Sequence, residues 1–520
     1  MNIPTPPLPN DLYSVSQVKK LEQLACKRQG INSFQLMKNA GATALKLTKK
    51  AWPKVRKILI LCGSGNNGGD GYIIAGLAKK EGLEVRILHL CRSNDLKGDA
   101  KLAYDFAGSH DVSMQAFTNL SEIGKRAGFD TIIIDALLGT GICRTVSGHY
   151  RRAIECINSA GCPVLALDVP SGLNADTGKP MSEAVTADIT ITFVGMKRGL
   201  LTGEGLDYCG RIFFEKLDLP DSIFESNVSP VPSARRIDIN FTNSHLSPRK
   251  KSSHKKHHGH VVVIGGDHGF GGAVILAAEA ALRSGSGLVS LLTRSDHRSA
   301  ALARRPELMI LGTEDEDGDP ESVLARATAI AVGPGLGRSD WSKHLLRLVL
   351  RLNKASSIPL VVDADALNLL SEELDVERMA RGNNWILTPH VGEAARLLGC
   401  SIEEVQNDRF AALKKLTTNW GGACLLKGSG SLTCNIDVSH SLCLCSEGNA
   451  GMASAGMGDV LSGIIVSLLG QGFSLFDALN CGVCIHGKAG DLAKEFGGER
   501  GLLASDLFPH LRELVNPCLK

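Results

Sequence analysis

Residues 57–71 read Lys-Ile-Leu-Ile-Leu-Cys-Gly-Ser-Gly-Asn-Asn-Gly-Gly-Asp-Gly, and this stretch decides the fold class. The apolar run Lys57–Cys62 predicts a strand that is buried on both faces, and the glycines that follow predict a turn into a helix over Tyr72–Lys80. From Gly63 to Gly68 the glycines satisfy the spacing G-x-G-x-x-G, which lets a backbone approach phosphate at a helix N-terminus. The stretch therefore indicates an α/β fold with a parallel sheet.

The same succession of apolar strand, glycine or aspartate, and helix recurs along the chain. Before it, residues 12–50 are typical of one or two helices. Strands that alternate with helices favour parallel sheets covered on both faces. The expected strands are Lys57–Cys62, Val85–Leu90, Thr131–Asp135, Val164–Asp168 and Thr190–Val194, then Val261–Gly266, Leu288–Leu292, Ala329–Gly333, Pro359–Asp363, Trp385–Pro389 and Ala423–Lys427.

The succession breaks between Ser226 and His258, where proline, polar residues and a basic run over residues 248–258 replace it. We therefore expect two α/β domains, residues 1–225 and 259–520, joined by a linker over 226–258. The basic run is interpreted as solvated linker, with attraction of a phosphate-rich ligand as the alternative. Its histidines lack cysteine or acidic partners in the segment, so no metal site is expected there.

Composition excludes several classes of protein. Of the 520 residues, 43% are hydrophobic and 21% charged, which argues against disorder. The formal net charge of +3 and an aromatic content of 5% give no reason to expect nucleic acid or a membrane surface as a partner. The uncharged stretch 460–476 is too short for a typical span. Fifteen cysteines in a chain of this length, without a signal-like N-terminus, predict a reducing, cytoplasmic setting.

The first glycine cluster carries residues that a simple phosphate-binding turn does not need. Asn66, Asn67 and Asp70 present acceptor oxygens, which repel phosphate and suit a cation. The strand Val85–Leu90 ends at Cys91-Arg92 instead of the acidic residue that holds a ribose.

Two further carboxylates, Asp135 and Asp168, end later strands. The carboxyl ends of parallel strands converge on one crevice, so a cation or ligand site is expected there. The alternative is that each aspartate only caps the next helix.

Residues 10–225 resemble the NAD(P)HX epimerase family. The resemblance rests on Gly65–Gly71, Asp135–Gly141 and Asp168–Gly172, followed by Thr190–Phe193 and Lys197. It implies a Rossmann-like three-layer fold that binds a hydrated nicotinamide dinucleotide, NADHX or NADPHX, beside K⁺. The implied K⁺ ligands are Asn67, Asp135 and Ser171. The implied substrate-binding residues are Asn66, Asn67, Gly68, Gly69, Asp70, Gly139, Thr140, Gly141, Ile142, Cys143, Arg144, Thr145 and Asp168.

Asp168 is the expected acid/base residue of that site. A carboxylate at a strand end can face the hydrated ring and exchange a proton during interconversion of the C6 epimers.

The densest glycine cluster of the second half is Gly448–Val460, which opens an apolar helix over Val460–Leu469. Gly456-Met-Gly458 at that helix start predicts an anion-binding nest that stabilises a transferring phosphoryl group. Asp459 is then placed to take a proton from an attacking hydroxyl. No P-loop sequence occurs, so phosphoryl transfer would use another architecture. The alternative for this motif is a turn followed by a capped helix.

Residues 245–517 resemble the ribokinase-like superfamily and, within it, the ADP-dependent NAD(P)H-hydrate dehydratases. The match rests on Asp363–Asn368, Thr388–Glu393 and Gly448–Asp459. It implies that ADP is a co-substrate, that the C6 hydroxyl is phosphorylated, and that phosphate then leaves to restore NAD(P)H, with AMP as by-product. Mg²⁺ is expected to neutralise the phosphates, with no ligand assigned. The implied contacts are Ala273, Gly335, His390 and Asp459 for the hydrate, and Lys427, Gly428, Ser429, Gly430, Ser431 and Gly458 for the nucleotide.

Two other functions are compatible with these motifs. One is a vitamin or hydroxymethyl-substrate kinase fused to a dinucleotide-binding module, and the other is a non-catalytic dinucleotide sensor. A kinase does not need Asn66, Asn67 and Asp70 with Asp135, and a sensor does not need Asp168 and Asp459. A homo-oligomer is expected, without nucleic acid or membrane partners.

The C-x-x-C pair Cys481 and Cys484 falls inside an expected helix over Phe476–Phe496. It is interpreted as buried small residues and not as a redox pair. Cys443 and Cys445 alternate along an expected strand and share one face.

Overall fold

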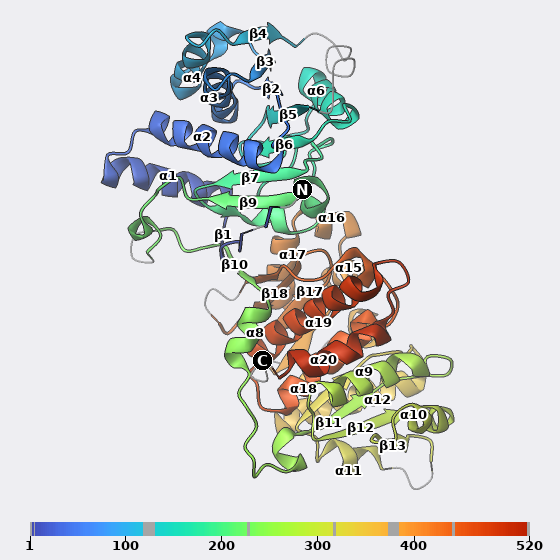
Figure 1. Cartoon of the computed structure of the whole chain (residues 1–520). Coiled ribbons are helices and arrows are strands. Elements are labelled where there is room, and N and C mark those ends of the chain that lie inside the picture. The colour runs from blue at the N-terminus through green and yellow to red at the C-terminus, as the bar shows by residue number, and fades with distance from the viewer. Residues whose placement is uncertain are drawn as a thin grey trace. The chain divides into compact units, whose positions relative to one another are not determined.

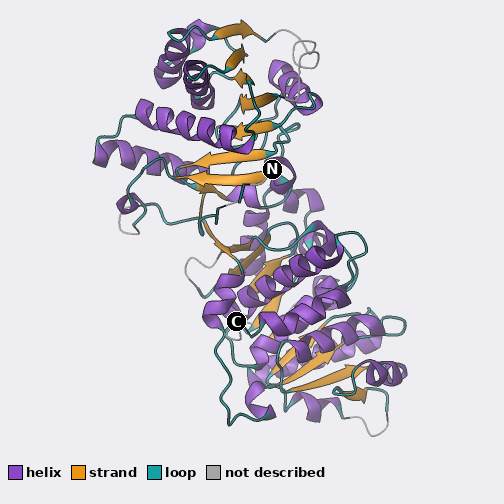
Figure 2. Cartoon of the chain, in the orientation of Figure 1, coloured by secondary structure: helices purple, strands orange, loops and turns teal. Residues whose placement is uncertain are grey.

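The computed structural model describes residues 3–4, 6–117, 130–225, 229–315, 319–372, 384–438 and 442–516. The chain divides into two compact units, Met1–Arg235 and Arg236–Lys520, so the division falls within the range expected to link two domains (Figure 1). Part of that range forms regular structure, in strand β10 (Ala234–Ile237) and helix α8 (Ile239–His245). Both units are built of strands and helices that alternate along the chain, as Figure 2 shows.

The sheet of the first unit is parallel throughout, in the order β4-β3-β2-β5-β6-β7-β9. Apart from the seventh strand, this is the strand order of the Rossmann fold, which confirms the fold predicted for this unit. The strands are β2 (Lys57–Cys62), β3 (Glu84–His89), β4 (Ser113–Ala116), β5 (Thr131–Ala136), β6 (Val164–Leu167), β7 (Ile189–Phe193) and β9 (Arg211–Glu215). Strands β4 and β9 were not among the predicted strands.

Helices cover both faces of this sheet, because the strand residues that point to either face are apolar. Ile58 and Ile60 belong to a core shared with helices α1 to α4, whereas Leu61 and Ile133 belong to a second core closed by α6. The helices are α1 (Val15–Gln29), α2 (Ser33–Ala51), α3 (Asn66–Lys80), α4 (Gly98–Gly108), α6 (Gly148–Ser159) and α7 (Gly205–Cys209). The short strands β1 (Asp11–Tyr13) and β8 (Met196–Lys197) pair beside this sheet.

Helix α3 begins at Asn66, not at the predicted Tyr72, so most of the glycine cluster is helical. The early start was missed because glycine has low helix propensity. Packing explains its glycines. A Cβ on Gly68 would lie 2.1 Å from the carbonyl oxygen of Gly63, and one on Gly71 would lie 2.7 Å from the Cβ of Ala136. The glycines therefore let α3 approach the strand ends.

The sheet of the second unit runs β13-β12-β11-β14-β15-β16-β17-β18-β19. It is parallel up to β17, and β18 and β19 continue it antiparallel. The strands are β11 (His260–Ile264), β12 (Leu288–Thr293), β13 (Met309–Gly312), β14 (Ala329–Val332), β15 (Leu360–Val362), β16 (Trp385–Leu387), β17 (Ala423–Leu426), β18 (Ser431–Asn435) and β19 (Cys443–Cys445). Strands β13 and β18 were not predicted, and the predicted strand at Cys443 and Cys445 is confirmed.

One large core packs α9, α18, α19 and α20 against this sheet. Helix α18 is buried along most of its length, and a Cβ on Gly463 would lie 2.1 Å from the carbonyl oxygen of Ala277 on α9. Among the described residues, no helix is long and apolar enough to cross a membrane. The other helices of this unit are α10 (Arg298–Arg304), α11 (Pro320–Leu324), α12 (Asp340–Ser356), α13 (Ala364–Glu372), α15 (Val391–Leu398), α16 (Ile402–Asn407) and α17 (Arg409–Trp420), with α9 (Gly271–Arg283), α18 (Met457–Gly470), α19 (Leu475–Gly497) and α20 (Phe508–Leu514).

Candidate active sites

The first unit contains a cavity of about 970 Å³ at the carboxyl ends of β2, β5 and β6. Its position follows from the strand order, because β3 and β5 flank β2 on opposite sides and leave a crevice above the sheet. Gly68 and Gly69 do not line it, and they face Gly63 and Met37 instead. The predicted residues that line it are Asn66, Asn67, Asp70, Gly139, Thr140, Gly141, Ile142, Cys143, Arg144, Thr145 and Asp168.

Asp168 follows β6 directly and reaches the cavity with its carboxylate about one-fifth exposed. Its Oδ1 accepts hydrogen bonds from the Lys197 ammonium, from the Thr192 hydroxyl at 3.2 Å and from the Phe193 amide at 3.3 Å. The backbone has φ = +63°, a left-handed conformation that costs about 1 kcal/mol or more for a residue other than glycine. The fold thus holds this carboxylate at the cavity wall in spite of local strain.

Lys197 lies behind Asp168 and is only 1% exposed. Besides Asp168, its ammonium donates to the carbonyl oxygen of Phe193 at 2.8 Å and to the hydroxyl of Thr192 at 3.1 Å. These contacts fix the lysine, which ends strand β8, against strand β7. Asp168 is therefore a carboxylate of the cavity wall whose counter-charge is buried behind it.

Two more carboxyl groups surround this pair. Burial raises the pKa of Asp70 well above its usual value, and the negative charges of Asp168 and Glu22 add to the rise. Desolvation also raises the pKa of Glu22, which lines the same cavity from helix α1. A raised pKa favours the protonated form of a carboxyl, and a protonated carboxyl is the form that can donate a proton.

Of the predicted cation ligands, Asn67 lines the cavity, whereas Asp135 and Ser171 do not line it and bond to each other behind the wall residue Leu138. The Asp135 carboxylate ends β5, is fully buried, and accepts hydrogen bonds from the Ser171 amide at 2.7 Å and the Ser171 hydroxyl at 2.6 Å. Burial raises the pKa of Asp135 to about 6, and these hydrogen bonds oppose the rise. The Ser171 hydroxyl also accepts from the amide of Leu138, a residue of the cavity wall.

Asn67 supplies the observation that favours a bound ion. Its side chain is 7% exposed, and neither its Oδ1 nor its Nδ2 has a hydrogen-bond partner among the described residues. A buried amide without partners costs about 1–3 kcal/mol, so a ligand is needed to satisfy it. A carbonyl oxygen, a carboxylate and a hydroxyl form a hard-oxygen donor set, which fits an alkali or alkaline-earth cation.

The second candidate site is centred on a buried ion pair at the ends of β15 and β17. The Lys427 ammonium donates to Asp363 Oδ1 at 2.7 Å, and the Ser462 hydroxyl donates to Asp363 Oδ2 at 2.7 Å. Burial alone would raise the pKa of Asp363, but Lys427 outweighs it and holds that pKa below its usual value. The carboxylate is 2% exposed and the lysine 19%, so the cation is the more accessible partner.

The N-terminus of helix α18 lies directly beside this pair. A Cβ on Gly458 would lie 3.3 Å from the Lys427 ammonium, and Gly456 begins the helix with φ = +85°. No side chain of the described residues caps this terminus, so its amides are open to an anion. Burial and the charge of Asp363 raise the pKa of Asp459 to about 6 in the first turn. Amides, an ammonium and a carboxylate thus meet at one point.

His390 and Glu393 form the next wall. The His390 amide donates to Glu393 at 2.8 Å, and the His390 Nδ1 accepts from the Gly392 amide at 2.9 Å, which caps helix α15. Glu393 lies 4.0 Å from the Lys427 ammonium, and burial raises its pKa to about 7. The His390 side chain is 56% exposed, and burial of its ring together with the charge of Lys427 lowers its pKa.

The predicted nucleotide-binding turn, Lys427–Ser431, connects β17 to β18 and rests on Arg409. This buried guanidinium donates from Nη2 to the carbonyl oxygens of Leu426 and Gly430, at 3.3 and 3.4 Å. Burial lowers the pKa of Arg409 to about 10. The turn residues Gly428 and Ser429 are exposed, and Gly430 and Ser431 are half-buried.

Ala273 and Gly335, two of the residues predicted to contact the hydrate, lie next to each other. A Cβ on Gly335 would lie 3.2 Å from the Cβ of Ala273, which belongs to the first turn of α9. The loop after β14 that carries Gly335 also approaches the ion pair, because a Cβ on Gly333 would lie 1.8 Å from the carbonyl oxygen of Asp363. Gly335 therefore belongs to the loop that contacts Asp363, and Ala273 packs against that loop.

The sequence did not identify four of the polar residues described above. Glu22, Lys197, Ser462 and Arg409 are each separated from their partners by a strand or helix whose position depends on the fold. Lys197 lay within a recognised motif, but its pairing with Asp168 follows only from the adjacency of β6 and β7. A basic residue inside an otherwise apolar segment was the available signal for Lys197.

Comparison with known proteins adds relatives along the whole chain. Residues 33–199 match the family described as YjeF-related protein N-terminus, and residues 261–512 match the family described as NAD(P)H-hydrate dehydratase. A bifunctional NAD(P)H-hydrate repair enzyme of Coxiella burnetii is 45% identical over 507 residues, which cover 97% of this chain and 99% of that protein. One of Escherichia coli K12 is 41% identical and covers 98% and 95%.

A solved structure supports the fold of the second unit. A ribokinase-like superfamily protein from Enterococcus faecalis V583 superimposes with a TM-score of 0.50 and 27% identity, covering 55% of this chain and 96% of that one. The ribokinase-like fold predicted for the second unit is thereby confirmed.

Proposed function

The chain belongs to the family of bifunctional NAD(P)H-hydrate repair enzymes, and from this membership we propose that its first unit epimerises NADHX or NADPHX and its second unit dehydrates the S form with ADP. We assign the first activity to residues 1–225 and the second to residues 259–520. The observation that carries the proposal furthest is the cavity in which Asp168 and Asp70 meet around Lys197. Neither a fused kinase nor a dinucleotide sensor requires that cluster.

In the first unit Asp168 exchanges the proton. The C6 hydroxyl of the hydrated ring leaves as water once it is protonated, and water then adds to the opposite ring face. Asp168 serves this exchange as an ionised group ion-paired with Lys197, and Asp70, whose pKa is raised, supplies a protonated carboxyl. The loop Gly139–Thr145 and Asn66 line the same cavity and are positioned to bind the dinucleotide.

We propose Asn67, Asp135 and Ser171 as the residues that hold K⁺ at the base of this cavity. The proposal is supported by the unpartnered amide of Asn67 and by the buried carboxylate of Asp135. The ion would supply positive charge next to the bound dinucleotide. Asp135 keeps its own geometry through the hydrogen bonds from Ser171 in either case.

In the second unit Asp459 takes the proton from the C6 hydroxyl as that oxygen attacks the β-phosphorus of ADP. The open amides around Gly458 and the ammonium of Lys427 stabilise the transferred phosphoryl group. The O–P bond to AMP breaks. The C6–O bond then breaks as inorganic phosphate leaves, and C5 loses a proton to solvent, which restores the C5=C6 double bond of NAD(P)H. Phosphate is a better leaving group than hydroxide. Mg²⁺ would neutralise phosphate charge during the transfer, and no residue is assigned as its ligand.

The remaining contacts follow from position. Ala273, Gly335 and His390 are proposed to contact the hydrate, and the turn Lys427–Ser431 to bind the nucleotide. The turn is supported for this role by the exposed residues Gly428 and Ser429 and by the Lys427 charge at its start. The cytoplasmic setting and the homo-oligomeric state stay predictions.

The test separates the two activities on one protein. The R and S forms of hydrated NADH are incubated with the full chain, with and without ADP, and the absorbance of reduced nicotinamide is followed. The S form should recover only with ADP. Asp168→Asn should slow recovery of the R form by about 100-fold or more and leave the S form unaffected. Asp99→Asn, at the same cavity but outside the carboxyl cluster, is the matched control.

Asp459→Asn tests the second assignment. It should abolish ADP-dependent recovery of both forms while R and S forms still interconvert, as followed by chromatography. Asp340→Asn, another aspartate in the first turn of a helix, should leave both activities intact. Recovery of the S form at the wild-type rate by Asp459→Asn would remove that residue from the proposal.

A further inference from the structure

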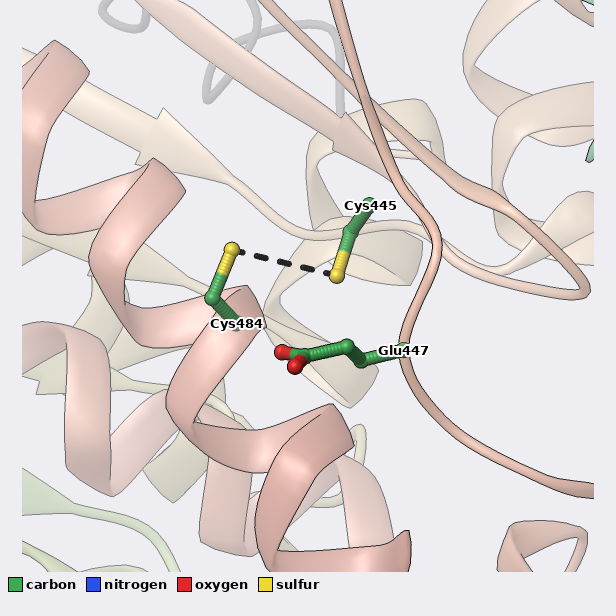
Figure 3. Close-up of side chains that lie close together, drawn as sticks. All are labelled: Cys445, Glu447 and Cys484. Atoms are coloured by element: carbon green, nitrogen blue, oxygen red, sulfur yellow. Dashed lines mark hydrogen bonds between the residues drawn. The ribbon is translucent and has the colours of Figure 1, made fainter. Parts of the chain in front are cut away.

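Three potential metal ligands cluster in the second unit among residues that the proposed chemistry does not use. Cys445 ends strand β19, Cys484 lies on helix α19, and Glu447 begins the segment after β19 (Figure 3). One ligand atom from each lies within 4.8 Å of the other two. The figure shows the two thiols facing each other, with the Glu447 carboxylate directed toward the same space.

The fold brings this cluster together at a close approach of two backbones. A Cβ on Gly487 would lie 2.8 Å from the carbonyl carbon of Glu447, so glycine is needed there for the segment after β19 to rest on α19. Gly487 follows Cys484 by one helical turn, which places Glu447 and Cys484 on the same side of the helix. Cys445 and Cys484 are 1% and 0% exposed.

The groups of the cluster are incompletely satisfied. Glu447 Oε2 is buried and has no hydrogen-bond partner among the described residues. Within the described part of the chain, the Cys445 thiol makes only long sulfur contacts, 3.8 Å to the carbonyl oxygen of Val483 and 3.9 Å to the Cys484 sulfur. A buried carboxyl oxygen without a partner is costly, and a cation would satisfy it.

We propose that Cys445, Glu447 and Cys484 bind one zinc-type divalent cation, with water as the fourth ligand. Two sulfurs on a tetrahedral Zn²⁺, each at about 2.3 Å, lie about 3.8 Å apart, close to the observed 3.9 Å. A disulfide would require about 2.05 Å, so the thiols stand at the spacing for a shared ion. Two thiolates, a carboxylate and a divalent ion leave one negative charge. The nearby charged groups are the Lys488 ammonium and the carboxylates of Asp238 and Asp491.

The site has a structural consequence for the second unit. The ion would join the end of β19 to the middle of α19, immediately before the segment Gly448–Gly458 that leads to Asp459. Binding to the folded state alone stabilises that state in proportion to the logarithm of metal concentration. Zn²⁺ is therefore expected to raise the unfolding temperature of the second unit.

The proposal is tested with Co²⁺ as a spectroscopic probe on the reduced, metal-free full chain. Wild type should show the visible bands of tetrahedral Co²⁺ and a thiolate charge-transfer band, at one ion per chain, and Zn²⁺ should abolish both. Cys445→Ser and Cys484→Ser should lose the bands, and Glu447→Gln should weaken Co²⁺ binding at least tenfold. Cys481→Ser, a buried cysteine on the same helix, is the matched control and should bind normally.

A second measurement does not depend on the folding of any variant. Zn²⁺ should protect Cys445 and Cys484 of wild type from alkylation during partial unfolding, relative to Cys481, as read by mass spectrometry. The proposal is overturned if folded wild type gives no Co²⁺ bands, or if the bands persist without Cys445 or Cys484. Formation of a Cys445–Cys484 disulfide under mild oxidation, with no Co²⁺ binding after reduction, would replace the metal site with a redox pair.

Discussion

Each unit places a buried lysine–aspartate pair at the ends of its parallel strands, but the two pairs face opposite ways. In the first unit Lys197 is 1% exposed and Asp168 20%, so the anion reaches the cavity. In the second unit Asp363 is 2% exposed and Lys427 19%, so the cation is the accessible partner. The same two residue types therefore present opposite charges to their surroundings.

The difference corresponds to the two proposed reactions. Epimerisation needs a carboxylate that exchanges a proton with the C6 hydroxyl, and the buried lysine holds that carboxylate in place. Nucleotide-dependent dehydration needs positive charge beside transferring phosphate, and the buried aspartate holds the lysine in place. In each unit the more buried member positions the member that faces substrate.

The largest expected effect is on the free energy of unfolding, when the lysine of each pair is replaced. Lys427→Met leaves Asp363 buried without its counter-charge, and the free energy of unfolding of the second unit should fall by about 3–5 kcal/mol. Lys197→Met leaves Asp168 in contact with a solvated cavity, and its cost should be nearer 1 kcal/mol. Differential scanning calorimetry of the full chain measures both.

The double variant Asp363→Asn with Lys427→Met is the control for that comparison, because it removes both charges. It should recover a large part of the lost stability. Equal destabilisation by Lys197→Met and Lys427→Met would show that the exposure of the remaining carboxylate does not matter.

The next effect is the pH dependence of dehydration. The pKa of Asp459 is raised to about 6, so this base is ionised above pH 6 and becomes protonated below it. The rate with saturating ADP should therefore be level above pH 6 and fall about tenfold per pH unit below it. The positive charge of Lys427 lowers the pKa of Asp459, so in Lys427→Met the fall should begin at higher pH. An unchanged pH profile in that variant would show that the charge of Lys427 does not act on Asp459.

A third effect distinguishes the units by monovalent cation. Replacing K⁺ by Li⁺ at constant ionic strength should slow epimerisation about tenfold, the cost of leaving the Asn67 amide unsatisfied. Dehydration of the S form should be unaffected. Asn67→Ala should remove the dependence on K⁺, and persistence of that dependence in the variant would place the ion elsewhere.

The smallest effect concerns the turn that carries Lys427. Arg409→Lys keeps the charge but cannot reach several carbonyl oxygens at once, so the Lys427–Ser431 turn should loosen. The KM for ADP should rise about threefold, with kcat and epimerisation unchanged. Steady-state kinetics measures this, and a loss of kcat without a change in KM would argue that Arg409 acts on Asp459 and not on the turn.

Much of this organisation could be predicted from local sequence. The predicted strands of both units were found, with ends shifted by one or two residues, because continuous β-branched runs leave little choice. Helices α3 and α18 began upstream of prediction, at Asn66 and Met457, since glycine-rich first turns are weak helix signals that packing stabilises. The positions of Asp168 after a strand and of Asp459 in the first turn of a helix could also be predicted, and their roles stay predictions.

The partners of those residues could not be predicted in the same way. The contact of Lys197 with Asp168 depends on which strand lies next to β6, and that of Ser462 with Asp363 on how α18 lies against the sheet. The proximity of Cys445 to Cys484 likewise depends on the approach of α19 to β19. Pairwise contacts between distant segments are set by the tertiary fold and leave little trace in local patterns.

The left-handed backbone at Asp168 also limits how this protein can evolve. Glycine adopts a φ of +63° freely, and asparagine and aspartate adopt it at a smaller cost than branched side chains do. A lineage that abandoned epimerisation could exchange the carboxylate for asparagine or glycine and keep its fold, and other exchanges would carry a folding penalty as well. Decayed descendants of this unit should therefore be enriched in those two residues at this position.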